Sequence, residues 1–325
     1  MKLLTPLRIG GSLLSCLLPF FLLAQTTPNV ILDTDIGPDY DDVGAMAVLH
    51  TLADSGQVNI LATVASNQSK YIAGVLSVLN TYFKRPNIPI GVVRGRGVNM
   101  IAGQKWDSLL VAKYPHKIKS NDQAEDALAL YRRILAAQPD GSVTLVTVGF
   151  LTNMADLLIS KPDKYSPLSG QDLIKKKVKK LVSMAGRFPS SREFNVDRDP
   201  VSSKIVFDGW PTPIIFSGFE IGMAIHTGLP LTRNEKIKNS PVKDVFALSI
   251  PLSKQDENGR MSWDQTAVLV AIKGHEPYYT LEEGRFIARD NGVSDWNPAG
   301  KGHYRLVEKM PVPQVERVLE DLMAR

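Results

Sequence analysis

The stretch NVILDTDIGPDYDDVGAMAVL, residues 29–49, places five aspartates within ten positions: Asp33, Asp35, Asp39, Asp41 and Asp42. An apolar run precedes them and predicts a buried strand, and the apolar spacing that follows predicts a helix over residues 41–54. Carboxylates this close repel one another by about 1 kcal/mol per pair at ~4 Å in water, and by more where water is excluded. A cluster of this kind at a strand–helix junction needs a physical reason.

Strand-like apolar runs alternate with stretches of helical periodicity along most of the chain. The strand-like runs occupy residues 58–66, 88–93, 142–148, 178–186 and 212–218. The helix-like stretches occupy residues 70–83, 121–138, 151–160 and 199–210. This alternation predicts an α/β fold with a mostly parallel sheet flanked by helices. No repeat or low-complexity linker interrupts it, which predicts one domain over residues 25–325.

Polar residues follow several of the predicted strands directly. The aspartates follow the first strand and Asn67 follows the second, while the segments GFLTN (149–153) and GRFPSSREFN (186–195) follow later ones. Because ligands of parallel α/β folds bind beyond the carboxyl ends of the strands, these residues predict a site at that edge of the sheet. The polar, proline-containing stretch 230–260 is predicted to be a long loop or lid near the site.

The first 24 residues differ from the rest of the chain. Lys2 and Arg8 precede a short apolar run that ends at Ala24, a pattern typical of a secretory signal peptide, so we expect export to a periplasm or out of the cell. The run is short for a membrane span, which needs ~20 apolar residues, so no stable membrane insertion is expected. Cys16, the one cysteine of the chain, lies in this segment, and we do not expect it to be lipidated. Without the segment, the chain has no disulfide and no thiolate metal site.

The remaining composition is that of an ordinary folded protein, with 44% hydrophobic and 22% charged residues. The formal net charge is +5, and two of the basic residues belong to the predicted signal peptide. The basic run at 174–180 is predicted to be a solvated lead-in to a strand. Nucleic acid is therefore not an expected partner.

Three explanations of the aspartate cluster compete. A solvated turn at a helix N-terminus favours one or two acidic residues through the helix dipole and leaves the others without a role. An EF-hand loop matches Asp33, Asp35 and Asp41, but Pro38 stands at its glycine position and Gly44 at its glutamate position. A hard-cation site of carboxylates, completed by ligands from elsewhere, accounts for the whole cluster, and oxygen-only ligands favour Ca²⁺ or Mg²⁺.

The segment ILDTDIGPDYDD resembles the N-terminal signature of the inosine-uridine preferring nucleoside hydrolases, roughly Asp-x-Asp-Pro-Gly-x-Asp-Asp after the first strand. The likeness continues, in the same order, through TVASNQ, VGFLTNMADL, MAGRFPSSREFNVDRDP and WDQTAVLVA, up to about residue 272. The resemblance implies a Rossmann-like nucleoside hydrolase fold. It also implies Ca²⁺-dependent hydrolysis of the N-glycosidic bond of ribonucleosides, through an oxocarbenium-like transition state.

The resemblance assigns metal ligands to four positions. Asp35 corresponds to the aspartate that both touches the Ca²⁺ and takes a proton from the attacking water, which makes it the predicted catalytic residue. Asp42 and Asp264 correspond to further carboxylate ligands, and Val148 to a main-chain carbonyl ligand. A divalent cation among these carboxylates would turn their repulsion into attraction and lower the pKa of a bound water.

Substrate contacts are implied at four more positions. Asp41 corresponds to the carboxylate that binds the ribose hydroxyls. Asn67 and Asn195 match ribose-binding asparagines, and Glu193 matches a residue near the 5′-hydroxyl.

The sequence departs from the family pattern at two of these places. Five residues separate Asp35 from Asp41 where the pattern has three, so Asp39 is additional and the assignment of the ribose carboxylate stays open. Arg187 stands where the family often has a sugar-binding asparagine, and it would meet either a modified or anionic substrate group or a neighbouring aspartate.

Trp263 precedes the last metal aspartate, where some family members have a histidine that protonates the leaving base. A tryptophan here resembles the purine-preferring branch of the family, in which aromatic stacking activates the base. Trp106 is the candidate for the opposing aromatic face, with core packing as the alternative. These residues predict a preference for purine nucleosides.

Two other functions are compatible with parts of the pattern. ILDTD is also similar to the Asp-x-Asp of phosphohydrolases that use the first aspartate as a nucleophile, although Gly37 stands where those enzymes usually have Thr or Val. A non-catalytic, calcium-dependent nucleoside- or sugar-binding protein is the third alternative. The expected partner is a small nucleoside or related riboside, and a homodimer or homotetramer is the candidate assembly.

Overall fold

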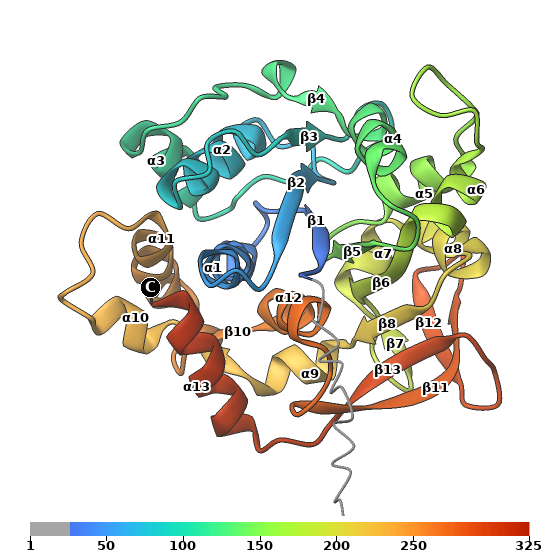
Figure 1. Ribbon diagram of the computed structural model, residues 1–325. Helices are drawn as coiled ribbons and strands as arrows, with labels where there is room; N and C mark the ends of the chain where they lie inside the picture. Colours follow the sequence, from blue (N-terminus) through green and yellow to red (C-terminus); the bar gives the residue numbers. More distant parts are fainter. Residues whose placement is uncertain (1–26, 325) are drawn as a thin grey trace, which may run out of the picture.

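The computed structural model describes residues 27–324 (Figure 1). The predicted signal peptide and Cys16 lie outside these residues. Among the described residues, no helix has the length and hydrophobicity needed to cross a membrane.

An eleven-stranded sheet runs through the molecule in the order β4-β3-β2-β1-β5-β6-β8-β13-β11-β12-β7. All neighbours from β4 to β13 in this order are parallel, and the remaining pairs are antiparallel. The parallel strands are β1 (Asn29–Thr34), β2 (Asn59–Ala65), β3 (Ile90–Val92), β4 (Glu125–Asp126), β5 (Val143–Thr147), β6 (Val178–Met184) and β8 (Ile214–Ser217). Strand β13 (His303–Glu308) pairs parallel with β8 and antiparallel with β11, and β7 (Ser190–Arg192), β11 (Tyr279–Ala288) and β12 (Val293–Asn297) pair only antiparallel. This confirms the predicted α/β fold with a mostly parallel sheet.

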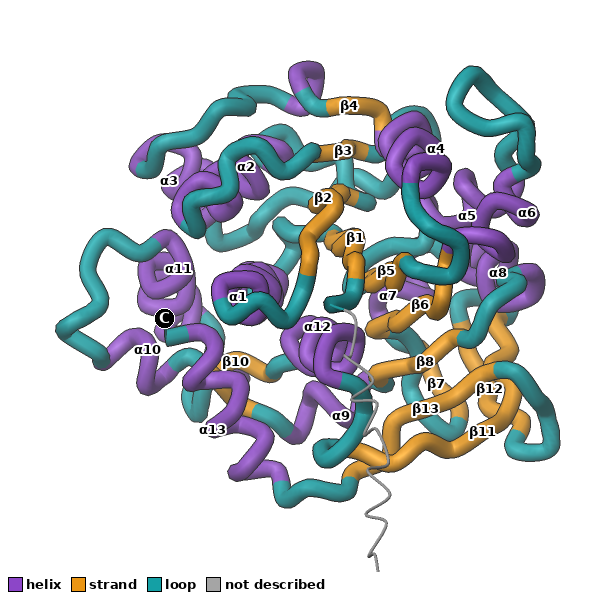
Figure 2. The backbone as a smooth tube through the Cα atoms, viewed as in Figure 1, coloured by secondary structure: helices purple, strands orange, loops and turns teal. Residues whose placement is uncertain are grey.

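Helices cover both faces of the sheet, as the tube in Figure 2 shows. One apolar cluster joins β1 to α1 (Asp41–Asp54), α2 (Ile72–Tyr82), α11 (Pro241–Ser249), α12 (Trp263–Lys273) and α13 (Val312–Met323). A second cluster contains α4 (Ala127–Ala137), α5 (Thr152–Ile159), α6 (Gly170–Lys177) and α8 (Pro200–Gly209). Strands buried on both faces read as continuous apolar runs, which is why their positions were predictable from sequence.

The remaining elements are short. They are α3 (Trp106–Lys113), α7 (Phe194–Arg198), α9 (Phe219–Ala224), α10 (Leu229–Arg233), β9 (His226–Thr227), β10 (Arg260–Met261), and 3₁₀ turns at Asn121–Gln123, Ile250–Leu252 and Lys254–Asp256. Strands β9 and β10 pair with each other in a separate two-stranded sheet.

Two sequence expectations need correction. The predicted loop over residues 230–260 contains α11, which Ser240 caps by accepting the N–H of Lys243 and which Pro241 begins, so local capping signals outweigh the polar composition. The helix expected from residue 121 begins only at Ala127, because Glu125 and Asp126 first add an edge strand beside β3. The antiparallel strands β11 to β13 were not predicted.

Candidate active site

The strand-end aspartates lie in the turn between β1 and α1. Asp35 is 4% exposed, and Asp41 and Asp42, the first two residues of α1, are each 1% exposed. Parallel pairing of β1 with β5 brings Gly149, just after β5, against Asp35. A Cβ atom at Gly149 would lie 2.4 Å from the amide nitrogen of Asp35 and 2.7 Å from its Oδ1, so only glycine fits there.

Asp264 joins this turn from far along the chain. It is the second residue of α12, which packs against α1, and it is 4% exposed. Its backbone N–H donates to Oδ2 of Asp41 over 3.3 Å. The N-terminal ends of two neighbouring helices therefore hold the buried carboxylates together.

Three of these carboxylates have no cationic partner. Burial raises the pKa of Asp35, Asp42 and Asp264 well above the usual range, and the neighbouring aspartates raise it further. Oδ1 of Asp42 accepts a hydrogen bond from the Thr34 hydroxyl, whereas its buried Oδ2 has no partner. Buried charges are costly unless they are paired or bind a metal. The three residues thus fit the role of metal ligands, and their oxygen donors suit a hard divalent cation.

A second grouping of carboxylates overlaps this one. Single oxygens of Asp39, Asp41 and Asp42 lie within 4.8 Å of one another. Arg260, however, pairs with Asp39 at 2.5 Å and with Asp41 at 2.8 Å. Asp42 is therefore the one carboxylate of this group that has no cationic partner and is available to bind a metal ion.

A cavity of about 240 Å³ opens beside the aspartates. Carboxylates and amide groups form one part of its wall and aromatic rings another. It is lined by Asp35, Asp39, Asp41, Val148, Met184, Glu193, Phe194, Asn195, Phe219, Gln255, Arg260, Trp263 and Asp264. Most of the residues predicted from sequence are thus brought together around one space.

Glu193 lines the cavity as the N-cap of α7. Its Oε1 accepts the N–H of Asn195 at 2.8 Å, and its Oε2 accepts those of Gly186 at 3.1 Å and Val196 at 3.2 Å. Burial raises the pKa of Glu193 to about 7, although these hydrogen bonds oppose the shift. The backbone therefore holds the carboxyl group rigidly in place.

Asn195 is fixed to the two strands beside it. Its Nδ2 donates to the carbonyl oxygens of Val148 and Met184, both at 3.1 Å. Val148, whose carbonyl is a predicted metal ligand, lines the same cavity, and this carbonyl already accepts one hydrogen bond. A carbonyl oxygen has a second lone pair for another partner.

Aromatic side chains form the wall near α12. The indole N–H of Trp263 donates to the carbonyl oxygen of Phe219 at 2.7 Å, and their rings lie 5.1 Å apart at a tilt of 32°. Phe194, 37% exposed, adds a third ring. Arg187 is exposed and lies outside the lining, with its guanidinium 4.8 Å from the centre of the Phe219 ring.

Besides Arg187, two more predicted substrate residues, Asn67 and Trp106, do not line the cavity. The Nδ2 of Asn67 donates to the carbonyl oxygens of Asp35 at 3.0 Å and Met100 at 2.8 Å, so its amide ties two loops together. Trp106 is 1% exposed and lines a different cavity with Leu109 and Leu110. The prediction of Trp106 as an aromatic face opposite Trp263 is wrong, and core packing is its role.

Arg260, Phe219 and Phe194 are the main residues of the cavity that the sequence interpretation missed. Phe194 lies between two predicted residues, and Arg260 lies only four positions before Asp264, so proximity to the motifs was the available signal. Phe219 lies two positions after the end of β8, where the rule on strand ends applied as well.

Asp33 is excluded from the cavity. It is fully buried, and its Oδ2 accepts hydrogen bonds from the Tyr131 hydroxyl and the Asn153 amide, both at 2.8 Å. A phosphohydrolase nucleophile would need access to substrate at this position. The phosphohydrolase alternative is therefore wrong.

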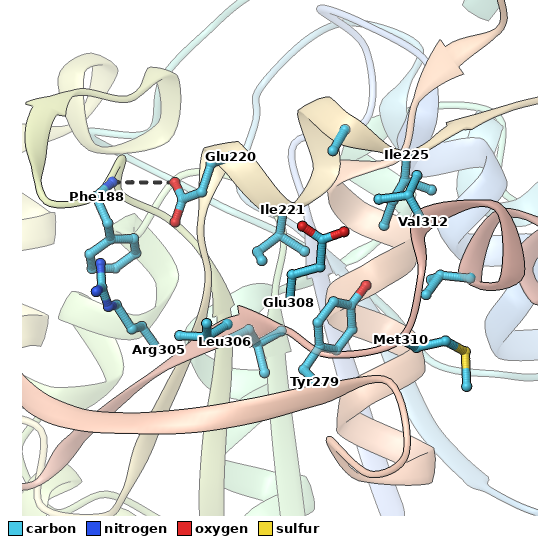
Figure 3. Close-up of a pocket in the computed structure, with 13 residues that line it drawn as sticks. Phe188, Glu220, Ile221, Ile225, Tyr279, Arg305, Leu306, Glu308, Met310 and Val312 are labelled. Atoms are coloured by element: carbon cyan, nitrogen blue, oxygen red, sulfur yellow. Dashed lines mark hydrogen bonds between the residues drawn. The ribbon is translucent and has the colours of Figure 1, made fainter.

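A second cavity of about 250 Å³ lies on the other side of α9 (Figure 3). Ile221 of α9 and Ile225 just after it line this cavity together with Tyr279 and Met310, whereas Phe219 of α9 lines the aspartate cavity. Its lining is mainly apolar, and the predicted site residues all lie elsewhere. Two carboxylates, Glu220 and Glu308, line this second cavity, but none of the predicted metal-binding aspartates does.

Comparisons with known proteins agree with this geometry. The family model described as inosine-uridine preferring nucleoside hydrolase matches residues 30–306. A pyrimidine-specific ribonucleoside hydrolase RihA from Salmonella dublin is 28% identical over 244 residues, which are 69% of this chain and 67% of the relative.

Solved structures show the same fold at lower identity. An inosine-uridine preferring nucleoside hydrolase from Bacillus anthracis has a TM-score of 0.69 at 14% identity, covering 91% of this chain and 99% of its own. A purine-preferring ribonucleoside hydrolase from Gardnerella vaginalis has a TM-score of 0.70 at 16% identity, covering 91% and 98%. The chain belongs to the inosine-uridine preferring nucleoside hydrolase family and is a hydrolase that acts on N-glycosyl compounds.

Proposed function

We propose that this protein is a Ca²⁺-dependent hydrolase that cleaves ribonucleosides, with a preference for purine nucleosides, to ribose and free base. The supporting observation is the set of three buried carboxylates without a cationic partner, Asp35, Asp42 and Asp264, of which Asp35 and Asp264 line an aromatic-walled cavity. Carboxylates together with a backbone carbonyl, that of Val148, form a ligand set that suits Ca²⁺ better than Mg²⁺.

Asp35 is the proposed general base. It is the carboxylate of the turn that both lines the cavity and lacks a hydrogen-bonded cation, so it is placed to take a proton from an attacking water. A divalent cation bound at this site would lower the pKa of that water. The surrounding carboxylates stabilise the positive charge that develops on the sugar in an oxocarbenium-like transition state.

The sugar end of the substrate is proposed to lie between Asp41 and Glu193. Both line the cavity, and both have oxygens that are oriented by fixed donors. Because the amide of Asn195 is engaged by two carbonyls, it would bind a hydroxyl through its Oδ1. This arrangement favours a riboside with free hydroxyl groups.

The base is proposed to lie against Trp263 and Phe219. Among the described residues that line the cavity none is a histidine, and we assign activation of the base to stacking on these rings. A base–aromatic stack contributes ~1–3 kcal/mol, and a purine offers more area than a pyrimidine. The similar hydrolase from Salmonella dublin is named as pyrimidine-specific, and the one from Gardnerella vaginalis as purine-preferring. Both base preferences therefore occur among proteins similar to this chain.

The test is a reducing-sugar assay on a panel of nucleosides with Ca²⁺ or with chelator. We expect inosine, guanosine or adenosine to be cleaved at least ~10-fold more efficiently than uridine or cytidine, which corresponds to ~1.4 kcal/mol. Uridine cleaved as fast as inosine would refute the purine preference alone. Inactivity on every nucleoside would refute the substrate class.

We also propose that the chain is exported and that residues 1–24 are removed. The supporting pattern is the basic start, the short apolar run and Ala24 at its end. Mass spectrometry of the protein from its native cell tests this, and a mature chain that retains residues 1–24 would contradict it.

A further inference from the structure

Arg260 is a buried cation within the proposed active site that none of the motifs assigns. Its side chain is 4% exposed, and it lines the aspartate cavity. It belongs to β10, which pairs with β9, and the N–H of Ser262 just after β10 donates to two carbonyls of the α9 region, those of Gly222 and Ile225. The backbone that carries Arg260 is therefore anchored on both sides.

The guanidinium of Arg260 donates two hydrogen bonds to one oxygen of Asp41. Its Nε and Nη2 both donate to Oδ1 of Asp41, at 3.2 Å and 2.8 Å, and Nη2 also donates to Oδ2 of Asp39 at 2.5 Å. The other oxygen of Asp41, Oδ2, accepts the N–H of Asp264. Donors thus hold both oxygens of Asp41, so its carboxylate plane cannot rotate freely.

Aromatic rings and a third carboxylate hold the guanidinium itself. Its central carbon lies 4.9 Å from the ring centre of Tyr40 and 5.0 Å from that of Trp263. Nη1 lies 3.6 Å from Oδ1 of Asp256, while Oδ2 of Asp256 accepts the Tyr40 hydroxyl at 2.9 Å. A planar fork between rings is a geometry that lysine cannot reproduce.

We propose that Arg260 is a positioning residue that orients Asp41 so that its Oδ2 binds one hydroxyl of the vicinal 2′,3′ pair of a riboside. This inference rests on the proposed function. Arg260 occupies both lone-pair sites of Oδ1, and the N–H of Asp264 occupies one site of Oδ2, so one site of Oδ2 is left for a hydroxyl donor. By fixing the carboxylate plane, Arg260 sets the direction of that remaining site. Without Arg260, the carboxylate of Asp41 would be repelled by Asp39 and Asp264 and would turn away from the substrate.

The experiment compares Arg260→Met and Arg260→Lys in the full chain with Ca²⁺ present. For Arg260→Met we expect the KM for inosine to rise about 10- to 100-fold, the effect of losing one charge-assisted hydrogen bond, while kcat stays within about threefold. Arg260→Lys should recover only part of the loss, because it keeps the charge and loses the fork. The inosine dissociation constant, measured by calorimetry, should follow KM.

A double-mutant cycle separates positioning from a merely structural role. In an Asp41→Asn background, Arg260→Met should add no more than about a threefold change, because the two residues act through the same contact. Arg132→Met is the matched control. Arg132 belongs to α4, lies outside the cavity and is 1% exposed, and its guanidinium pairs with the carboxylate of Asp163 at 2.9 Å. It should lower the melting temperature and leave the KM for inosine unchanged.

Two results would overturn the inference. One is an unchanged KM and dissociation constant in Arg260→Met, and the other is a full effect of Arg260→Met in the Asp41→Asn background. If Arg260→Met does not fold, Arg260→Lys with the same cycle decides. Wild-type protein that binds inosine but does not cleave any nucleoside would refute the proposed function, and the affinities would still test the role of Arg260.

Discussion

At the scale of single residues, Asp33 and Asp35 show that burial alone does not define a catalytic carboxylate. Both are nearly inaccessible, yet Asp33 accepts two side-chain hydrogen bonds from α4 and α5, whereas Asp35 faces the cavity and other carboxylates. A carboxylate that accepts hydrogen bonds from neutral donors of neighbouring helices, and that does not line a cavity, serves the fold. One that is surrounded by like charges needs a cation or a proton, and it is available for chemistry.

Asp35→Asn removes the proton acceptor and one negative charge at nearly constant size. We expect kcat to fall by several orders of magnitude with the fold retained, because the residue lies beyond the end of β1 and not in the apolar core. Steady-state kinetics and circular dichroism measure the two effects. Asp107→Asn, a buried aspartate of α3 outside the cavity, is the control, and Asp35→Asn turnover above a tenth of wild type would exclude Asp35 as the base.

Trp263→Ala tests the aromatic wall. If stacking acts in the transition state, kcat for inosine should fall together with binding, by about 10-fold or more overall. Trp263→Phe keeps a ring and loses the hydrogen bond to the Phe219 carbonyl, so it separates stacking from anchoring. A change confined to KM would mean that the indole only holds the substrate.

At the scale of elements, the junctions after strands set the positions of the functional groups. The turn after β5 illustrates this, because Gly149 there leaves just enough space for Asp35. The start of α12 likewise presents Asp264 to Asp41 of α1. Small changes in how these elements approach would therefore move the carboxylates relative to one another.

Gly149→Ala should displace Asp35 by collision. We expect a loss of about 1–3 kcal/mol in the free energy of unfolding, and about 100-fold in kcat because misplacement by ~1 Å has an effect of that order. Gly103→Ala is the matched control, since a Cβ there meets nothing within 4 Å. Urea unfolding and kinetics check both variants, and equal behaviour of the two would show that the contact with Asp35 is unimportant.

His50 couples α1 to α2. Its Nε2 lies 3.0 Å from Oδ1 of Asn80, its ring stacks on Phe83 at 4.7 Å, and burial lowers its pKa to about 3. The folded state thus holds His50 neutral where the unfolded chain binds a proton, so its contribution to stability is present above pH ~6.5 and is lost as pH falls toward about 3.

His50→Gln should flatten this part of the stability profile. For the wild type, the free energy of unfolding should fall between pH 6.5 and 4 by up to ~1.4 kcal/mol per pH unit from this one group. Denaturant titrations at several pH values measure the slope. His116→Gln, at a partly exposed position, serves as control, and an identical slope in wild type and His50→Gln would contradict the assignment.

At the scale of the whole molecule, the carboxylates oppose folding unless a cation balances them. Asp35, Asp42 and Asp264 come from two helices and a strand end that pack together only in the folded chain. A divalent ion that binds them therefore binds the folded state and stabilises it by mass action. The metal and the fold are thermodynamically linked.

Removal of the metal should lower the melting temperature. With Ca²⁺ at ~100 times its dissociation constant, the linkage amounts to ~2.7 kcal/mol, and chelator should abolish it together with activity. Elemental analysis should find about one Ca²⁺ per chain. Absence of any divalent cation, with an unchanged melting temperature in chelator, would refute the metal site.

The sequence by itself determined most of the parallel part of the sheet, the helices that alternate with those strands, and the edge where the chemistry lies. Apolar runs and helical spacing are local properties, and they marked β1, α1, β5 and β6 within a residue or two of their ends. The rule that parallel strands present their carboxyl ends together then placed the aspartates, Val148, Glu193 and Asn195 around one space.

Only the tertiary structure decided which partner each side chain has. Arg260 donates hydrogen bonds to Asp41, which lies 219 positions away in the sequence. The amide of Asn67 donates to the backbone of two loops, and Trp106 packs in the core and does not line the active-site cavity. Such partners depend on long-range packing, where burial, hydrogen bonding and charge compete for the same atoms, and no local pattern encodes the result. Asp39, Asp41, Asp35 and Asp42 are the same residue type in one short segment, yet their roles differ. The distant Arg260 forms ion pairs with Asp39 and Asp41 and leaves Asp35 and Asp42 without a cationic partner.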